Sequence, residues 1–316
     1  MNLTAMAMRI VASAISISVG CDGPGGDRKA GEIVTNSLGM EFVYVPPGEF
    51  LMGSALTAAG AERDEMPQHP VRIDNGFLMG RTEVTKGQFN AFVEDALWET
   101  QAEREGWAYA WRDGSFQILY GASFRAPGFD QMDDHPAVCV SWNDAVEFCR
   151  WLSHREGRLY RLPTEAEWEY GCRAGSQAAF QWSDRPEDGP GWCNVADRTA
   201  RENLQGMKST YLFFPWHDGY TFTAPVGRFR ANAFGLHDMH GNVLEFCSDW
   251  YASDYYATGR LVDPQGPETG QFRILRGGDW SSGHTACRSA KRYRDRPGIR
   301  CSNLGFRVVM DPNQSP

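Results

Sequence analysis

Two long stretches of this chain, residues 98–135 and 173–235, carry little periodicity of apolar residues. Loops of that length are uncommon in a compact domain unless they are functional or braced from within. The composition points the same way, because 34 glycines, 17 prolines and 11 tryptophans in 316 residues favour irregular backbone held by aromatic packing. We therefore expect one loop-rich domain, with bound metal ions as a natural brace.

Regular elements are predicted only where local signals are strong. Three capping boxes mark the starts of helices with an apolar face. They pair Thr85 with Gln88, Ser141 with Asp144 and Thr164 with Glu167. The segment Met40–Ser54 predicts two short strands separated by a Pro-Pro-Gly turn. Val71 and Ile73 alternate with Arg72, as in a half-buried strand.

The formal net charge of −9 argues against a nucleic-acid partner, whose phosphates need Lys and Arg. The basic residues that are present cluster late, from Arg288 to Arg307. Because the planar fork of arginine suits buried carboxylates, we favour internal Arg–carboxylate pairs over a phosphate-binding patch.

The N-terminus has the proportions of a signal peptide. The apolar stretch Ile10–Val19 follows Arg9 and is too short to span a bilayer. We predict a signal over residues 1–20, lipid attachment at Cys21 and a flexible tether over residues 21–35. An ordinary cleaved signal with an incidental cysteine is the alternative. Either way the protein is expected to be exported to a bacterial envelope. Membrane contact is expected only through the lipid anchor, if Cys21 carries one.

Export implies an oxidising compartment, in which cysteines tend to pair. The seven cysteines after Cys21 are Cys139, Cys149, Cys172, Cys193, Cys247, Cys287 and Cys301. An odd number leaves at least one thiol free or paired between molecules. Their spacing contains no CxxC or Cys/His array, so a structural zinc site is not expected.

Six separated stretches carry a family resemblance. They read NSLGMEFVYVPPGEFLMGS, RTEVTKGQFNAFV, DDHPAVCVSWNDAVEFCRWL, YRLPTEAEWEYGCRAG, GLHDMHGNVLEFCSDWY and the run from Arg273 to Val309. In this order they resemble the family of the formylglycine-generating enzyme, also called sulfatase-modifying factor. The resemblance covers a domain over residues 36–312, followed by a tail over 313–316. It implies an α+β, C-type-lectin-like fold with limited regular structure.

The family also carries two calcium sites, and this chain matches the ligands of both. The resemblance implies one site at Asn194, the Val195 carbonyl, Asp218 and the Tyr220 carbonyl, and a second at Asp238, the carbonyls of Gly241 and Val243, and Glu245. Carboxylate, amide and backbone oxygens together suit this hard cation. The alternative is that the acidic side chains only cap turns. Two structural calcium ions would brace the unpatterned loops.

Active members of the family oxidise a sulfatase cysteine to formylglycine with molecular oxygen, and two thiolates shortly after a Gly-Gly bind copper(I). Counting forward from Gly277-Gly278, Ser282 stands at the first thiolate position and Cys287 at the second. A serine hydroxyl is a hard oxygen and does not replace a thiolate for copper(I). Copper is therefore not expected.

Counting backward from Asn303-Leu304-Gly305-Phe306-Arg307 gives another alignment, in which neither thiolate position is filled. Cys287 is then a core or disulfide cysteine. A Cys172–Cys287 bridge is our hypothesis, although the family's partner position for Cys172 falls near Ser289.

The same surface would form the pocket that receives a peptide in active relatives. Its expected lining is Asp279, Trp280, Ser282, His284 and Arg288, with tryptophan and arginine as favoured anchors. The sequence thus predicts a protein- or peptide-binding accessory module without copper chemistry. The alternatives are a formylglycine-generating oxidase, or another oxidative activity, at a rearranged site, and a structural envelope lipoprotein.

Overall fold

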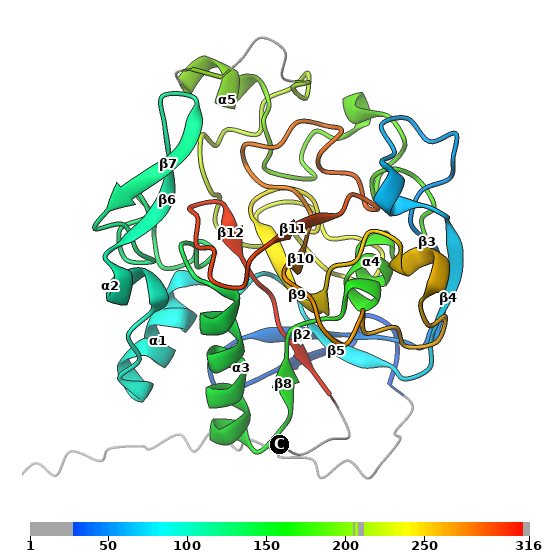
Figure 1. Cartoon of the computed structure of the whole chain (residues 1–316), viewed down its shortest axis with the longest axis horizontal. Helices are drawn as coiled ribbons and strands as arrows, with labels where there is room; N and C mark the ends of the chain where they lie inside the picture. Colours follow the sequence, from blue (N-terminus) through cyan, green and yellow to red (C-terminus); the bar gives the residue numbers. More distant parts are fainter. Residues whose placement is uncertain (1–27, 205, 208–211, 312–316) are drawn as a thin grey trace, which may run out of the picture.

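Two small sheets and two hairpins carry the regular strands of the computed structural model, which describes residues 28–204, 206–207 and 212–311 (Figure 1). The five-stranded sheet has the order β1 (Ile33–Thr35), β2 (Glu41–Val45), β5 (Phe77–Gly80), β13 (Val309–Met310) and β8 (Tyr160–Arg161). The four-stranded sheet has the order β11 (Tyr293–Asp295), β10 (Arg273–Arg276), β9 (Leu244–Trp250) and β12 (Leu304–Gly305). The hairpins are β3 (Gly48–Met52) with β4 (His69–Ile73), and β6 (Trp107–Arg112) with β7 (Ser115–Tyr120). The predicted α+β, loop-rich fold is confirmed.

The predicted tether ends earlier than expected. Strand β1 begins at Ile33 and pairs antiparallel with β2, so residues 33–35 belong to the sheet. The predicted signal over residues 1–20, Cys21 and the tail over 313–316 lie outside the described residues. In the part of the chain that the structure does describe, no helix is long and apolar enough to cross a bilayer.

The three longest helices begin where the capping boxes place them. They are α1 (Lys86–Ala96), α3 (Trp142–Glu156) and α4 (Glu165–Arg173). In each, the N-cap side chain accepts from a backbone N–H of the first turn, and the third helical residue returns a bond to the N-cap. These reciprocal bonds satisfy amides that a helix start otherwise leaves unpaired.

The stretch 98–135 is more regular than its sequence suggested. It contains α2 (Gln101–Glu105) and the β6–β7 hairpin, which lies beside α2 in Figure 1. Two local signals were available. Thr100 and Glu103 form a fourth capping box, and the hairpin turns at Asp113-Gly114, with φ of 47° and 84°. An Asp-Gly pair of this kind suits a two-residue hairpin loop.

The stretch 173–235 remains mostly irregular and is held by aromatic packing. Among its described residues the helical segments are α5 (Arg198–Asn203) and the short turn Pro186–Asp188. Phe180 stacks on Trp182 with ring centroids 4.8 Å apart, and Phe222 stacks on Phe129 at 4.4 Å. Stacked rings bury large areas without needing a regular backbone. The remaining short helix is α6 (Tyr255–Thr258).

Most of the late basic cluster is paired internally, as predicted, while Arg294 and Arg296 are exposed. Bidentate bonds join Arg288 to Glu65 and Arg292 to Glu165, and Arg307 pairs with Glu245 in the same way. Lys291 pairs with Glu62, and Arg300 with Glu105. Because these pairs neutralise most of its charges, internal pairing accounts for the cluster better than a phosphate-binding patch.

Candidate functional site

The turn after β10 carries the two positions at which the family's thiolates are expected. It begins at Gly277 and Gly278, whose φ angles of 98° and 75° favour glycine. A Cβ on Gly278 would lie 2.6 Å from the Sγ of Cys287, so the turn needs glycine to admit that sulfur. The backbone thus brings Cys287 back onto the Gly-Gly.

Cys287 is fully buried and faces Ser282. Its Sγ lies 3.5 Å from the Ser282 carbonyl oxygen, and that carbonyl also accepts from Ala196 N–H at 3.0 Å. Burial, with a contribution from Asp279, raises the pKa of the Cys287 thiol well above its ordinary value of 9.0. Cys287 is therefore protonated at neutral pH, unlike a reactive thiolate.

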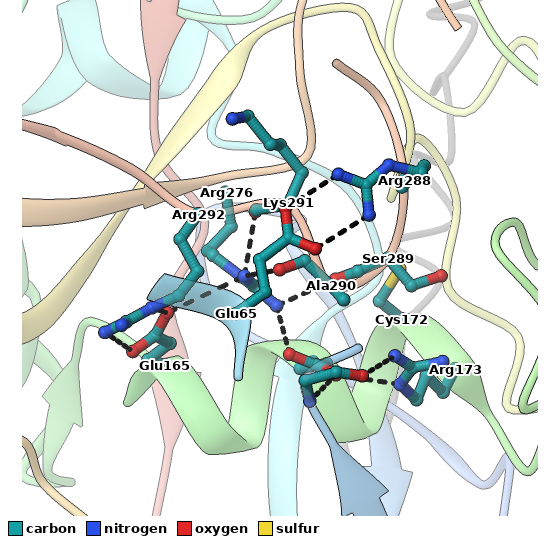
Figure 2. A network of polar contacts seen from close by, with 12 residues as sticks. Glu65, Glu165, Cys172, Arg173, Arg276, Arg288, Ser289, Ala290, Lys291 and Arg292 are labelled. Atoms are coloured by element: carbon teal, nitrogen blue, oxygen red, sulfur yellow. Dashed lines mark hydrogen bonds and ion pairs between the residues drawn. The ribbon is translucent and has the colours of Figure 1, made fainter. Parts of the chain in front are cut away.

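The predicted Cys172–Cys287 bridge is not formed, because both residues are free thiols that belong to different core clusters. The sulfur of Cys172 lies 3.6 Å from Nε2 of His240. It also interacts with Ser289, next to which it lies in Figure 2. Serine at 289 thus stands where the backward count placed the partner of Cys172.

A second thiol shares the cluster of Cys287. Cys193 is also fully buried there, among Phe180, Phe214 and Trp216. Burial and then Cys287 are the main causes that raise the pKa of Cys193 well above the ordinary value. The sequence offered no signal that connects these two cysteines, because only tertiary packing brings them into one cluster.

The five residues predicted to line a peptide pocket are mostly interior. Trp280 is fully buried, and its indole N–H donates to the Ser302 carbonyl at 3.3 Å. Asp279 accepts from Ser281 and from the Asn303 amide at 2.8 Å. The remaining three are Ser282 and Arg288, both buried, and His284, which is half-buried. These side chains mostly serve packing, hydrogen bonds and the Arg288–Glu65 ion pair, so little of their surface faces solvent, and the peptide pocket stays a prediction.

A buried ion network fixes the strand end that follows the turn (Figure 2). Arg276 pairs with Glu169 and donates to the carbonyl oxygens of Ser289, Ala290 and Lys291 at 2.7–3.0 Å. Glu169 also accepts from Arg173 Nε at 2.8 Å. Three elements, α4, β10 and residues 289–291, are therefore joined through one guanidinium.

The residues of the first predicted calcium site lie around Asp218. Its Oδ2 accepts from Val195 N–H at 2.8 Å and its Oδ1 from Tyr220 N–H at 2.7 Å. The Oδ1 of Asn194 is buried and has no partner among the described residues. Burial raises the pKa of Asp218 to about 7, and nearby Asp197 adds to the effect. This set offers oxygen ligands of the kind that suit a hard cation.

The second predicted set is only partly assembled. Asp238 accepts from Gly227 N–H at 2.6 Å through Oδ2, while its Oδ1 is buried without a partner in the described part of the chain. Glu245 instead receives two bonds of 2.6 Å from Arg307 and one of 2.7 Å from the Trp168 indole. The carboxylate of Glu245 is thus neutralised by an arginine, which does not fit a ligand role.

Glu83 is an acid at this place that sequence analysis missed. Its Oε1 accepts from the Asn242 amide at 2.9 Å, and its Oε2 is buried with no partner among residues that the structure describes. Burial, then Asp238 and Glu245, raise the pKa of Glu83 well above its ordinary value. The signal available was its position in the matching stretch RTEVTKGQFNAFV.

Over residues 28–204, 206–207 and 212–311, three or more His, Cys, Asp or Glu side chains nowhere form a metal-binding group. The candidate donors are instead a few acids supplemented by amide and backbone oxygens. Such a set suits calcium and not zinc or copper. The set around Asp218 fits a hard cation, as does the pair Asp238 and Glu83, whereas Glu245 does not.

Comparisons with known proteins identify the family of this chain. The model of the sulfatase-modifying factor enzyme 1-like domain matches residues 29–312. The chain is 35% identical over 303 residues to a formylglycine-generating enzyme of Thermomonospora curvata, covering 85% of this chain and 93% of that protein. It is 36% identical over 301 residues to the enzyme of the same name from Streptomyces coelicolor, covering 85% and 88%.

A solved structure is similar along the whole domain. PvdO from Pseudomonas aeruginosa superposes with a TM-score of 0.71 at 30% identity, covering 90% of this chain and 99% of PvdO. CarF shares the fold, with a TM-score of 0.52 at 24% identity. The chain therefore belongs to the sulfatase-modifying factor family, to which formylglycine-generating enzymes also belong.

Proposed function

We propose that this protein is an exported accessory member of its family, which binds a protein or peptide and does not carry out copper-dependent oxidation. The observation that carries the absence of copper chemistry is the pair of positions 282 and 287, whereas binding of a protein or peptide rests on the family resemblance alone. One holds an alcohol oxygen, and the other holds a buried, protonated thiol that faces a carbonyl. Copper(I) needs paired soft donors that can lose their protons. Export rests on the N-terminal sequence alone.

We propose further that calcium braces the irregular stretch 173–235. The unpartnered oxygens of Asn194, Asp238 and Glu83 support this, since buried polar atoms without partners are uncommon. The Asn242 side chain bonds both Asn194 and Glu83, so the two groups are neighbours. A calcium ion bound at each set would supply the positive charge that the carboxylates of Asp218 and Asp238 need.

One observation favours a second candidate, an oxidase with a rearranged copper site. Cys193 and Cys287 share a buried cluster, and both sulfurs together could give two soft ligands once deprotonated. In this reading Cys193 replaces the thiolate missing at Ser282.

A copper(I) titration separates the two candidates. We expect the reduced protein to lose copper(I) to a competing chelator as readily as the Cys193→Ala and Cys287→Ala variants do. Oxygen consumption with a cysteine-containing sulfatase peptide should be absent. Cys149→Ala is the matched control, since Cys149 is buried in a different cluster. Tight 1:1 copper binding that disappears in both the 193 and 287 variants would establish the oxidase candidate instead.

Calcium removal is expected to lower the melting temperature. An ion present at a hundred times its Kd stabilises a fold by about 2.7 kcal/mol. In a domain of this size that corresponds to roughly 4–5 °C for each ion. Asp218→Ala and Asp238→Ala should lower the melting temperature and remove most of its dependence on calcium. Asp95→Ala, at an exposed position on α1, is the control. An equal melting temperature in calcium and in chelator would refute both sites.

A further inference from the structure

A cavity of about 1040 Å³ opens on a part of the molecule away from the turn after β10. It lies between the β4–β5 turn, strand β8, the start of α4, strands β9 and β10, and the loop over residues 260–268. None of Ser282, Cys287, Asp218 or Asp238 belongs to its wall. It is therefore a separate site from those considered above.

Arg273 in the wall of this cavity has no ion-pair partner within the described residues. Its Nη1 donates to the Ser248 carbonyl at 2.6 Å, and its Nε is buried without a hydrogen-bond acceptor. The guanidinium carbon lies 3.7 Å from the ring centroid of Trp142 and 3.4 Å from that of Trp250. Two indole rings thus hold the guanidinium in place while leaving hydrogen-bond donors unused.

The other inner arginine of the same cavity shows the contrast. Arg161 forms two bonds of 2.7 Å with Glu167 and two of 3.1 Å with Asp311, which satisfies its charge twice over. Arg273 has nothing comparable. Burial lowers the pKa of Arg273 to about 10, and it remains a cation at neutral pH. A fixed, partly desolvated guanidinium without a carboxylate partner favours the binding of an anion.

We propose that this cavity binds a small molecule through one carboxylate, which Arg273 holds with its Nη groups. The Nε of Arg273 is buried and does not reach the ligand, so the Nη groups make the charge-assisted hydrogen bonds to the carboxylate. Trp250, also in the wall, offers apolar surface to the body of the ligand. This goes beyond the proposed function, which concerns a protein or peptide partner.

The charges of the wall favour a singly charged carboxylate over a phosphate. Its acids are Glu167, Asp263, Glu268 and Asp311, and its bases are Arg161, Arg260 and Arg273. Four acids against three bases leave a slight negative excess around the ligand. A monoanion with an uncharged or cationic body is tolerated there better than a doubly charged phosphate monoester.

Benzoate titrations of the reduced, calcium-loaded protein test this proposal, with heat or tryptophan fluorescence as the readout. Benzamide, its neutral counterpart, and phenyl phosphate, a dianion, serve as comparisons. We expect benzoate to bind at least tenfold more tightly than either. Arg273→Gln should weaken benzoate binding at least tenfold, and Arg273→Lys should fall between. Arg185→Gln, at an exposed site outside the cavity, should bind like the parent.

Benzoate binding no tighter than that of benzamide would overturn the site, as would unchanged binding by Arg273→Gln. Tighter binding of phenyl phosphate would overturn the carboxylate assignment. If Arg273→Gln does not fold, the indole N–H chemical shifts of the parent protein are measured instead. Benzoate bound to Arg273 is expected to change the shifts of Trp142 and Trp250, because both rings contact this guanidinium. Unchanged shifts would overturn the site. Copper titration and benzoate titration probe different residues, so failure of one leaves the other unaffected.

Discussion

Replacing Glu169 with glutamine is expected to lower the free energy of unfolding by about 3–5 kcal/mol, the cost typical of breaking a buried ion pair. Glu169 is fully buried and accepts from Arg173, from Arg276 and from Gly53 N–H at 2.9 Å. Glutamine keeps the size of the side chain but leaves two buried guanidinium groups without their shared anion. Arg276 would lose the partner that positions it against residues 289–291.

Urea unfolding at pH 7 measures the change. The matched control is Glu147→Gln, which removes a surface pair with Arg150 on α3 and should cost less than about 1 kcal/mol. A loss at Glu169 no larger than the loss at Glu147 would show that the network of Figure 2 does not stabilise the fold.

The effect should also depend on pH. Burial opposes ionisation of Glu169, but Arg173 and Arg276 outweigh it, so the pKa of Glu169 is lower than its ordinary 4.5. A depressed folded-state pKa contributes stability that is present above pH 4.5 and is lost as the pH falls through the folded value. The difference between parent and Glu169→Gln should therefore shrink below pH 4.5, and a difference that grows there would contradict this account.

The sequence predicted the elements whose signals are local. Capping boxes located α1, α3 and α4, because the bonds that start a helix join residues three apart. The same logic applied to Thr100 and Asp113-Gly114 would have located α2 and the β6–β7 hairpin. The sheet order was beyond local signals, since β13 pairs with β5 and β8 from the far end of the chain.

The candidate site also divides into residues that the sequence shows and contacts that only the structure shows. A serine at 282 is visible in the sequence, and the expectation that copper is not bound rests on it without any structure. Which side chains surround it is not visible. Cys193 and Cys287 are buried in the same aromatic cluster. Glu83 interacts electrostatically with Asp238, although the two lie in different parts of the chain. Glu245 matched a calcium ligand in the sequence, yet its carboxylate is held by Arg307. Only tertiary packing shows these contacts.

Truncation of Trp280 to alanine is expected to cost about 3–5 kcal/mol of stability, as for other large buried aromatic side chains. The ring meets Trp111 and Phe116 of the β6–β7 hairpin at centroid distances of 5.8 Å, and it meets Phe222 at 5.0 Å. The indole of Trp280 therefore packs the hairpin and the irregular stretch 173–235 against the turn after β10. Edge-to-face contacts of this kind add to the area that the indole buries.

Thermal and urea unfolding of Trp280→Ala test this role against that of a surface anchor for a peptide. Tyr120→Ala is the control, because Tyr120 is 81% exposed at the end of β7 and its loss should change stability by no more than about 0.5 kcal/mol. A peptide anchor would leave stability near that of the parent and weaken binding alone, which is the result that contradicts a packing role. A core residue lowers stability whether or not a partner is present, because the cavity left between the hairpin and the turn cannot be refilled by the rigid rings around it.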